Sequence, residues 1–302
     1  MAYQEQMVAV DAGFEGLSDM RAADPTIAPV DLSLEEEVLF LITYMRAERA
    51  QHGAIMEPLI PIDLESRQAY LRGLFNMRPP EPASPRFLAV QDDYLQRRLI
   101  ERGGPIDVEQ FPPFKGDKAR GADAKISLWQ GDETLLKVGA ATNGARRDLL
   151  GCFMPGHNCI DNAIHTYAGV QMRLACNVIA TELGKPAPPS SAYVTSGYNL
   201  PAEHVIHVVA PFADGDIPSK NQKMQLGDCY RACLSQAVKN GITSISFCCI
   251  STGTFGFRRE YAARIAIDAV RGYLNEYEPD LHVVFDMFRD DDVSLYQELL
   301  AQ

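Results

Sequence analysis

A nearly uninterrupted apolar segment at residues 242–250 constrains the fold of this chain more than any other feature. A strand without alternation of polar and apolar residues is typical of a central parallel strand that is buried on both faces. Residues 226–239 before it and 259–273 after it have the apolar spacing of amphipathic helices. Asn240 and Gly241 are typical of a helix end. The sequence therefore predicts parallel strands joined by helices in this part of the chain.

The alternation of strands and helices extends over the chain from Lys125 onward. Strands are predicted at residues 126–129, 204–209 and 281–287. Helices are predicted at residues 160–183 and 293–300. This order implies an α/β protein built as a βαβ sandwich.

The N-terminal third has a different character. Residues 1–30 mix Gly, Ala, Asp and Pro without periodicity, and we expect a mobile or loosely docked tail. A first helix is predicted to start after an N-cap at Asp31 or Ser33 and to end near Gln51. Two more are predicted at residues 64–77 and 87–101, each followed by proline or glycine. We expect these helices to form an extension, at residues 31–120, that packs on the main domain.

The charge balance excludes some classes of partner. The 302 residues carry a formal net charge of −12, whereas sequence-independent binding to nucleic acid or to an anionic membrane surface requires clustered basic residues. No apolar run approaches the roughly 20 residues that span a bilayer, and no signal peptide is visible. The seven cysteines do not suggest a disulfide framework. We therefore predict a cytoplasmic protein with reduced thiols and no nucleic-acid or membrane partner.

Residues 150–162 bring together side chains that bind metals. Cys152, His157 and Cys159 lie within eight positions, and Pro155 and Gly156 between them favour a tight chain reversal. A Zn²⁺ ion held by three protein ligands keeps a fourth position open, which is the arrangement of catalytic zinc sites. The alternative is a Pro/Gly loop whose buried cysteines act as small hydrophobic side chains. The density of ligand types favours the metal site.

A second candidate site follows the central strand. Residues 251–257, Ser-Thr-Gly-Thr-Phe-Gly-Phe, join this strand to the next helix. Glycines allow backbone N–H groups to approach phosphate oxygens, and the helix N-terminus favours an anion there. The spacing differs from that of a nucleoside-triphosphatase P-loop, and no lysine follows. An ordinary βα turn is the alternative, and this segment alone does not decide between the two.

Motifs along the chain resemble, in sequence order, those of macrodomains, the ADP-ribose-binding fold. They are Gln130-Gly131-Asp132-x-Thr134, Asn143-Gly144-Ala145, Leu149-Leu150-Gly151-Cys152, Cys159-Ile160-Asp161-Asn162-Ala163-Ile164-His165, Tyr198-Asn199-Leu200-Pro201 and Ser251-Thr252-Gly253. The segment G-C-F-x-P-x-H-x-C at residues 151–159 is similar to that of zinc-containing macrodomains, which act as protein ADP-ribose hydrolases in bacteria and some fungi. Residues 71–99 resemble the N-terminal helical extension of that group.

The resemblance implies a fold and a division of the chain. We expect an α/β protein with a three-layer α/β/α macrodomain and a mixed central sheet at residues 121–302. A small N-terminal helical extension would precede it at residues 31–120, after the tail at residues 1–30.

The resemblance also implies roles for matching residues. Cys152, His157 and Cys159 would hold zinc, and Asn143 and Asp161 would be the catalytic residues beside the distal ribose. Asp132 would accept a hydrogen bond from the adenine amine, whereas Phe257 could pack against the distal ribose. The ADP-ribose-binding residues implied in this way are Asp132, Glu133, Asn143, Asp161, Ser251, Thr252, Gly253, Thr254, Phe255, Gly256 and Phe257. His165 would make a structural hydrogen bond, and the other five cysteines would belong to the core.

Two functions follow from the resemblance. The first is a zinc-dependent hydrolase that removes mono-ADP-ribose from protein side chains, with a lipoyl-carrier protein as one candidate partner. The second is a reader that holds ADP-ribose without turnover, with zinc in the cleft. Arg146 favours the reader, because it stands where these macrodomains have a second asparagine. A third possibility is action on a small acyl-ADP-ribose or a phosphorylated derivative.

Overall fold

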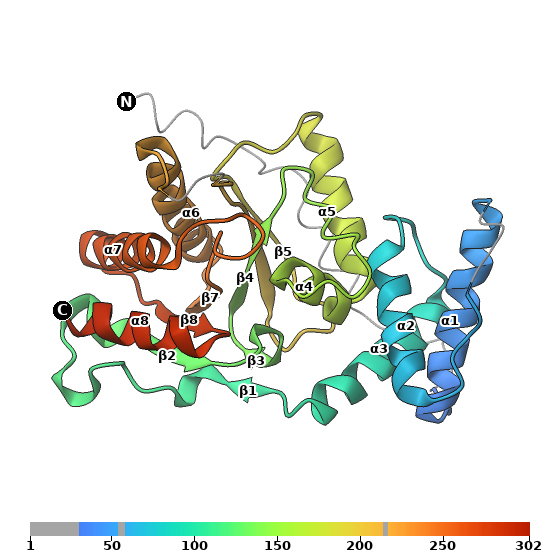
Figure 1. The fold of residues 1–302 in the computed structure, drawn as a ribbon. Helices are drawn as coiled ribbons and strands as arrows, with labels where there is room; N and C mark the ends of the chain where they lie inside the picture. The colour runs from blue at the N-terminus through green and yellow to red at the C-terminus, as the bar shows by residue number, and fades with distance from the viewer. Residues whose placement is uncertain (1–29, 54–57, 214–216) are drawn as a thin grey trace.

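The computed structural model describes residues 30–53, 58–213 and 217–302 (Figure 1). The predicted tail at residues 1–30 lies outside the described residues, except for Val30. No helix in the described ranges is both long and apolar enough to cross a membrane.

A mixed sheet of six strands forms the centre of the described structure, in the order β2-β8-β7-β4-β6-β5. Its strands are β2 (Ile126–Gln130), β4 (Ala140–Ala145), β5 (Ala192–Ser196), β6 (His204–Val209), β7 (Ser244–Phe247) and β8 (His282–Met287). β5 runs antiparallel to β6, whereas the other neighbouring strands are parallel. A smaller parallel pair joins β1 (Ile106–Asp107) to β3 (Leu136–Lys137). Short 3₁₀ helices lie at Val108–Gln110, Gly116–Lys118, Gly121–Lys125 and Glu133–Leu135.

Helices cover both faces of the large sheet, so the main domain has three layers, as the resemblance implies (Figure 1). One face packs on α6 (Lys220–Lys239), α7 (Arg259–Tyr277) and α8 (Asp290–Ala301). The other packs on α4 (Ile160–Ala168) and α5 (Val170–Leu183). β6 shows the division, because Ile206 and Val208 join the first core while Val205 and Val209 join the second.

Three helices form the N-terminal extension: α1 (Leu34–Gln51), α2 (Leu64–Met77) and α3 (Pro85–Glu101). Ser33 caps α1 through a capping box, which decides between the two predicted N-caps. The extension has an apolar core that includes Leu71, Leu74 and Phe87, and Val170 of α5 packs into it. It packs beside α4 and α5, on the side of the main domain away from α7 (Figure 1).

Two predicted elements differ from the structure. The predicted helix at residues 160–183 is two helices, because Gly169 has a φ of +93° and interrupts the backbone between α4 and α5. The predicted strand at residues 242–250 is shorter, since β7 covers only Ser244–Phe247. The apolar residues after β7, Cys248 and Ile250, are buried in the core without being part of the strand.

Candidate functional site

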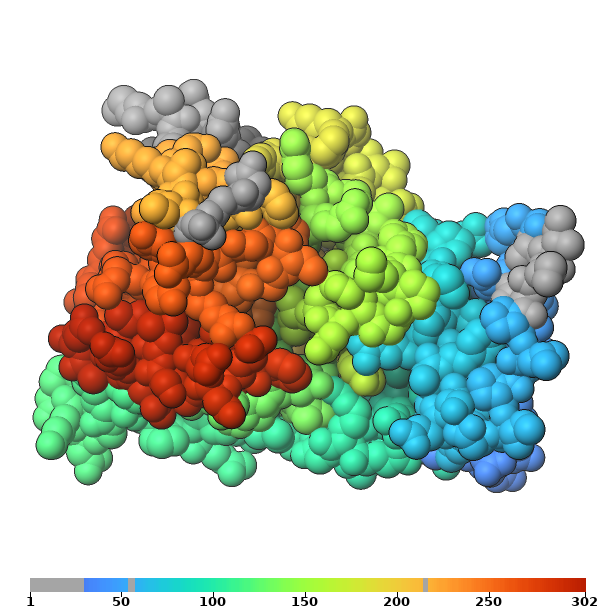
Figure 2. Space-filling model, in the orientation of Figure 1, coloured from blue at the N-terminus to red at the C-terminus, as the bar shows by residue number. Residues whose placement is uncertain are grey.

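The topology brings the candidate residues to one edge of the sheet. Five of its strands run parallel, so their carboxyl ends meet at the same edge. Asp132 follows β2, the segment 146–159 follows β4, and residues 251–257 follow β7. Figure 2 shows the surfaces of the last two segments, yellow-green and orange, on the same face of the molecule. The carboxyl edge of a parallel sheet is where α/β proteins bind their ligands.

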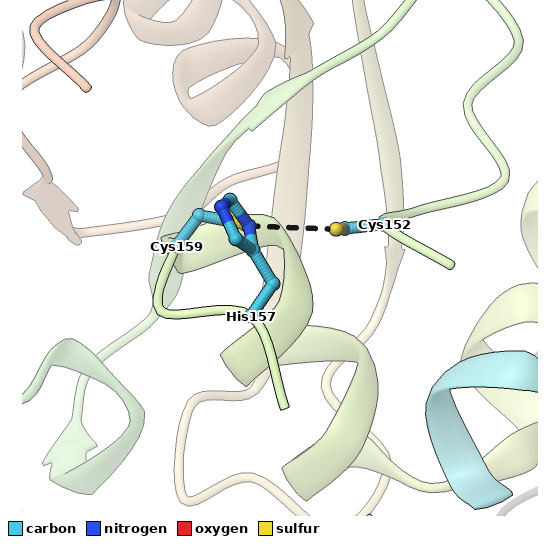
Figure 3. Close-up of side chains that lie close together, drawn as sticks. All are labelled: Cys152, His157 and Cys159. Atoms are coloured by element: carbon cyan, nitrogen blue, oxygen red, sulfur yellow. Dashed lines mark hydrogen bonds between the residues drawn. The ribbon is translucent and has the colours of Figure 1, made fainter. Parts of the chain in front are cut away.

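The metal loop, residues 152–159, brings its three candidate ligands together just before α4 (Figure 3). One donor atom from each of Cys152, His157 and Cys159 lies within 4.8 Å of the others. Sγ of Cys152 is 3.6 Å from Nδ1 of His157. Tetrahedral Zn²⁺ with usual Zn–S and Zn–N bond lengths separates two such atoms by about 3.6 Å. The residues therefore fit a zinc ion, and they would leave its fourth position free.

Cys159 has a second task, because it is also the N-cap of α4. Its Sγ accepts a hydrogen bond from the backbone N–H of Asn162 at 3.4 Å. Burial raises the pKa of the Cys159 thiol to about 12. A cation would favour the thiolate at this position, since the thiolate is the form that binds metals.

The side-chain amide of Asn143 lies at the centre of a buried network. Its Nδ2 donates a hydrogen bond to Oδ1 of Asp161 at 2.8 Å and lies 3.1 Å from Nδ1 of His207. Burial lowers the pKa of His207 to about 3, so the ring is neutral. With its proton on Nε2, His207 accepts from Asn143 and donates to Oγ1 of Thr195, 2.9 Å away. Both amide hydrogens are thus used, whereas Oδ1 has no hydrogen-bond partner within the described residues.

Asp161 and His165 lie one turn apart on α4. Burial raises the pKa of Asp161 to about 6, although the hydrogen bond from Asn143 opposes this shift. The hydrogen bond predicted for His165 is absent from the described residues, where neither ring nitrogen has a partner. Its Nε2 lies 3.6 Å from Oδ1 of Asp161. Burial also lowers the pKa of His165, so its ring is neutral beside the carboxylate.

The phosphate loop, residues 251–257, is shaped by contacts with the segment after β6. Oγ of Ser251 donates to the carbonyl oxygen of Pro211, and the carbonyl oxygen of Phe255 accepts from the N–H of Ala213. Gly256 has a φ of +78°, and a Cβ at this position would lie 2.4 Å from the oxygen of Ala213. In the described part of the chain, the backbone N–H groups of residues 253–255 donate to no other group. These N–H groups are therefore available to an anion.

The side chain of Phe257 does not lie on the surface of this loop. It is only 2% exposed and packs in the main core. The structure therefore gives no exposed ring at this position for a distal ribose, contrary to the expectation from the sequence. The other members of the loop are partly or fully exposed, except for the buried Ser251.

Asp132 and Glu133 point in different directions. Asp132 accepts hydrogen bonds from Thr134 and from Arg102 of the extension, and its side chain remains 37% exposed. Glu133 is 2% exposed, and its Oε1 accepts from Oγ of Ser246 at 2.6 Å. Burial raises the pKa of Glu133 to about 8. Glu133 therefore offers a ligand its backbone rather than its carboxyl group.

Within the described residues, the guanidinium of Arg146 forms no hydrogen bond with the network around Asn143, although its charge opposes the rise in the pKa of Asp161 that burial causes. Its side chain is 66% exposed, and Nη2 lies 3.2 Å from Oδ2 of Asp148. The Arg146 side chain therefore extends into solvent. Four of the five cysteines outside the metal loop are buried, as predicted for core residues, and the fifth, Cys249, is half-buried; the four are Cys176, Cys229, Cys233 and Cys248.

Comparison with known proteins agrees with this geometry. The Macro domain family model matches residues 142–266. A protein-ADP-ribose hydrolase from Treponema medium is 37% identical over 270 residues, which are 89% of this chain and 100% of that protein. A protein-ADP-ribose hydrolase from Staphylococcus aureus strain MRSA252 is 41% identical over 86% of this chain and 93% of that protein.

Solved structures agree as well. A Trypanosoma brucei macrodomain in complex with ADP-ribose is 31% identical, with a TM-score of 0.58, over 72% of this chain and 91% of that one. The Oceanobacillus iheyensis macrodomain with ADP is 32% identical, with a TM-score of 0.53, over 58% of this chain and 90% of that one. The chain belongs to the macrodomain family, and the two relatives from Treponema medium and Staphylococcus aureus, which match it over most of its length, are protein-ADP-ribose hydrolases.

Proposed function

We propose that this protein is a zinc-dependent hydrolase that removes mono-ADP-ribose from modified protein side chains. The observation that carries the proposal is the position of three zinc-type donors beside a buried Asn143–Asp161 pair. The phosphate loop lies at the same edge of the sheet, with free N–H groups. The names of the relatives agree with hydrolysis of protein-linked ADP-ribose.

Each part of the edge has a separate task in this proposal. The phosphate loop would hold the pyrophosphate through residues 253–255, and Asp132 would accept a hydrogen bond from the adenine amine. Asn143 would present Oδ1 to a ribose hydroxyl, because its two hydrogens are already used by Asp161 and His207. These anchors would fix the anomeric carbon against the reactive groups, which lowers the entropic cost of reaction.

The reaction breaks the bond between the anomeric carbon and the protein side chain; a water molecule supplies the hydroxyl group on the anomeric carbon and the proton on the released side chain. Asp161 would orient that water or the ribose, and as a carboxylate it would also stabilise positive charge that develops on the ribose. Zinc would supply Lewis-acid chemistry and a template at the ribose. Cys152, His157 and Cys159 are the residues that would hold it.

A release assay on mono-ADP-ribosylated protein tests this function. We expect the wild-type protein to release ADP-ribose and Asp161→Ala to release it at least about 100-fold more slowly, because the positioned carboxylate is lost. Asp148→Ala is a matched control, since this carboxylate contacts the exposed Arg146 instead of Asn143.

The second candidate function is a reader of ADP-ribose. Arg146 supports it, because the asparagine that related macrodomains carry there is replaced by an outward-pointing side chain. Tight ADP-ribose binding without any release by the wild-type protein would identify the reader and rule out the hydrolase.

We also propose the partner and the compartment. A lipoyl-carrier protein in the cytoplasm is the candidate substrate. Release of ADP-ribose from this carrier, compared with another modified protein at equal concentration, measures the preference. Equal rates on both would exclude the carrier as a specific partner.

A further inference from the structure

Two side chains of α2, in the N-terminal extension, contact the metal loop directly. Oδ1 of Asn76 accepts a hydrogen bond from the backbone N–H of Gly156 at 2.8 Å. Nη2 of Arg72 donates to the carbonyl oxygen of His157 at 3.3 Å and to Oδ1 of Asn162 at 3.0 Å. The loop residues that α2 holds are therefore a candidate ligand and its immediate neighbour.

The contact from Asn76 is specific in its geometry. Asn76 is fully buried, and its Nδ2 donates to Oγ1 of Thr166 at 2.8 Å. Oγ1 of Thr166 in turn donates to the carbonyl oxygen of Asn162, on the same helix. The Asn76 amide thus bridges the metal loop and α4. Its orientation is fixed because Oδ1 accepts from Gly156 and Nδ2 donates to Thr166. A buried amide with these partners is costly to remove or to turn, because each partner would lose its hydrogen bond.

Arg72 acts through a second side chain. Asn162, which accepts from Arg72, donates through Nδ2 to the carbonyl oxygen of Met154 at 3.0 Å. The backbone N–H of Asn162 also donates to Sγ of Cys159. Arg72 therefore holds the backbone at His157, which is a candidate ligand. Asn162 holds the backbone at Met154, which lies between two candidate ligands in the sequence.

The position of α2 is itself well determined. Leu71, Leu74 and Phe75 pack in the core of the extension, on the turns that carry Arg72 and Asn76. α2 also lies close to the loop, since a Cβ added at Gly73 would be 3.5 Å from Cβ of Pro155. A rigid helix surface therefore supports a loop that has no regular structure of its own between Cys152 and Cys159.

We propose that the helical extension positions the metal site, and that Asn76 and Arg72 are its positioning residues. The proposal rests on the metal site of the proposed function. Residues outside the ligand set that orient ligands in this way set metal affinity, and their loss typically weakens it 10–100-fold. Neither residue is one of the candidate ligands.

The test compares Asn76→Ala with Gln91→Ala. Gln91 is an equally buried amide of the extension, and it accepts from the N–H of Val170 at 2.8 Å without contacting the metal loop. Zinc affinity is measured by competition with a chromophoric chelator, and the thermal unfolding temperature is measured alongside. We expect Asn76→Ala to weaken zinc binding about 10-fold or more and Gln91→Ala to weaken it less than about 3-fold.

Hydrogen exchange of the metal-free protein gives a second readout. We expect the amide of Gly156 to exchange faster in Asn76→Ala than in the wild type, and to be unchanged in Gln91→Ala. Arg72→Lys, which keeps the charge, is a milder variant that we expect to weaken zinc binding by a smaller factor.

Equal zinc affinities and equal exchange of the loop in the Asn76 and Gln91 variants would overturn the proposal. Absence of zinc from the wild-type protein would instead overturn the metal part of the proposed function. In that case the exchange of Gly156 still decides whether α2 positions the loop.

Discussion

The metal loop and the phosphate loop lie at the same edge of the sheet, but they are held in different ways. Side chains hold the metal loop: Asn76, Arg72 and Asn162 bind its backbone, and two of the three come from the extension. Backbone groups mainly hold the phosphate loop, through bonds such as that from the N–H of Phe257 to the carbonyl oxygen of Ser251.

This difference follows from the kind of group that each loop would offer to a ligand. The metal loop presents side-chain donors at fixed separations, so its backbone needs support from outside the loop. The phosphate loop presents backbone N–H groups, so its conformation is set by backbone dihedrals and close backbone contacts. We therefore expect single side-chain changes to affect the first loop strongly, and to affect the second only where a glycine or a close approach is involved.

Removal of a candidate zinc ligand should lower zinc content and the hydrolysis rate more than substitutions in the phosphate loop, at His207 or at Arg146. We expect Cys152→Ala to lose its zinc and to lower the hydrolysis rate at least about 100-fold, since two ligands hold zinc poorly. Elemental analysis and the release assay measure both quantities. Cys249→Ala is the control, because this half-buried cysteine lies outside the metal loop. Retention of zinc by Cys152→Ala would remove Cys152 from the ligand set.

A glycine substitution should disturb the phosphate loop. In Gly256→Ala the new Cβ would lie 2.4 Å from the oxygen of Ala213, at a φ of +78°. The left-handed conformation alone costs an L-residue about 1–2 kcal/mol, so we expect ADP-ribose affinity to fall about 10-fold or more by calorimetry. The exposed Thr254→Ala should change affinity less than about twofold. A large loss in Thr254→Ala would show that side chains also bind the phosphate.

Two substitutions of His207 should distinguish the role of its Nδ1 atom from that of its Nε2 atom. His207→Asn places an acceptor near the position of Nδ1, which faces Asn143, whereas His207→Gln places a donor near that of Nε2, which faces Thr195. We expect the glutamine variant to lower kcat/KM roughly 5- to 10-fold, because one of the two amide hydrogens of Asn143 loses its acceptor. The asparagine variant should stay within about threefold of the wild type. Equal losses would indicate a purely structural histidine.

Substitution of Arg146 should change the release rate least. Its side chain is 66% exposed and pairs only with the half-exposed Asp148 among the contacts described. We expect Arg146→Ala to change the release rate less than about twofold, because surface ion pairs contribute little. A much larger change would place this guanidinium in contact with the substrate.

The sequence predicts much of the fold because local signals and tertiary packing agree. The helix at residues 64–77 begins and ends where predicted, since Asp63 caps its first turn and prolines follow its last residue. The break at Gly169 does not appear in the apolar spacing, which continues through residues 160–183. The positive φ of Gly169 interrupts the helix even though the apolar spacing continues.

The candidate site is predicted less completely than the fold. The three metal-loop residues are close in sequence, so their convergence is visible from spacing alone. His207 is hidden in an apolar strand, and its contact with Asn143 depends on the pairing of β4 with β6. Asn76 is about 80 residues from the loop that it holds. Its only local signal is an amide among the apolar residues of α2, since a buried amide requires partners.

The contact between α2 and the metal loop has a consequence for synthesis on the ribosome. α3 ends at Glu101, and the metal loop begins at Cys152. At about 5–20 residues per second, the extension leaves the ribosome several seconds before the loop that it supports. Most of the apolar core of the extension comes from α1, α2 and α3 themselves, so these helices can begin to assemble in that interval. The loop then meets a surface that already carries Arg72 and Asn76, so the contacts that hold it can form as soon as it is synthesised.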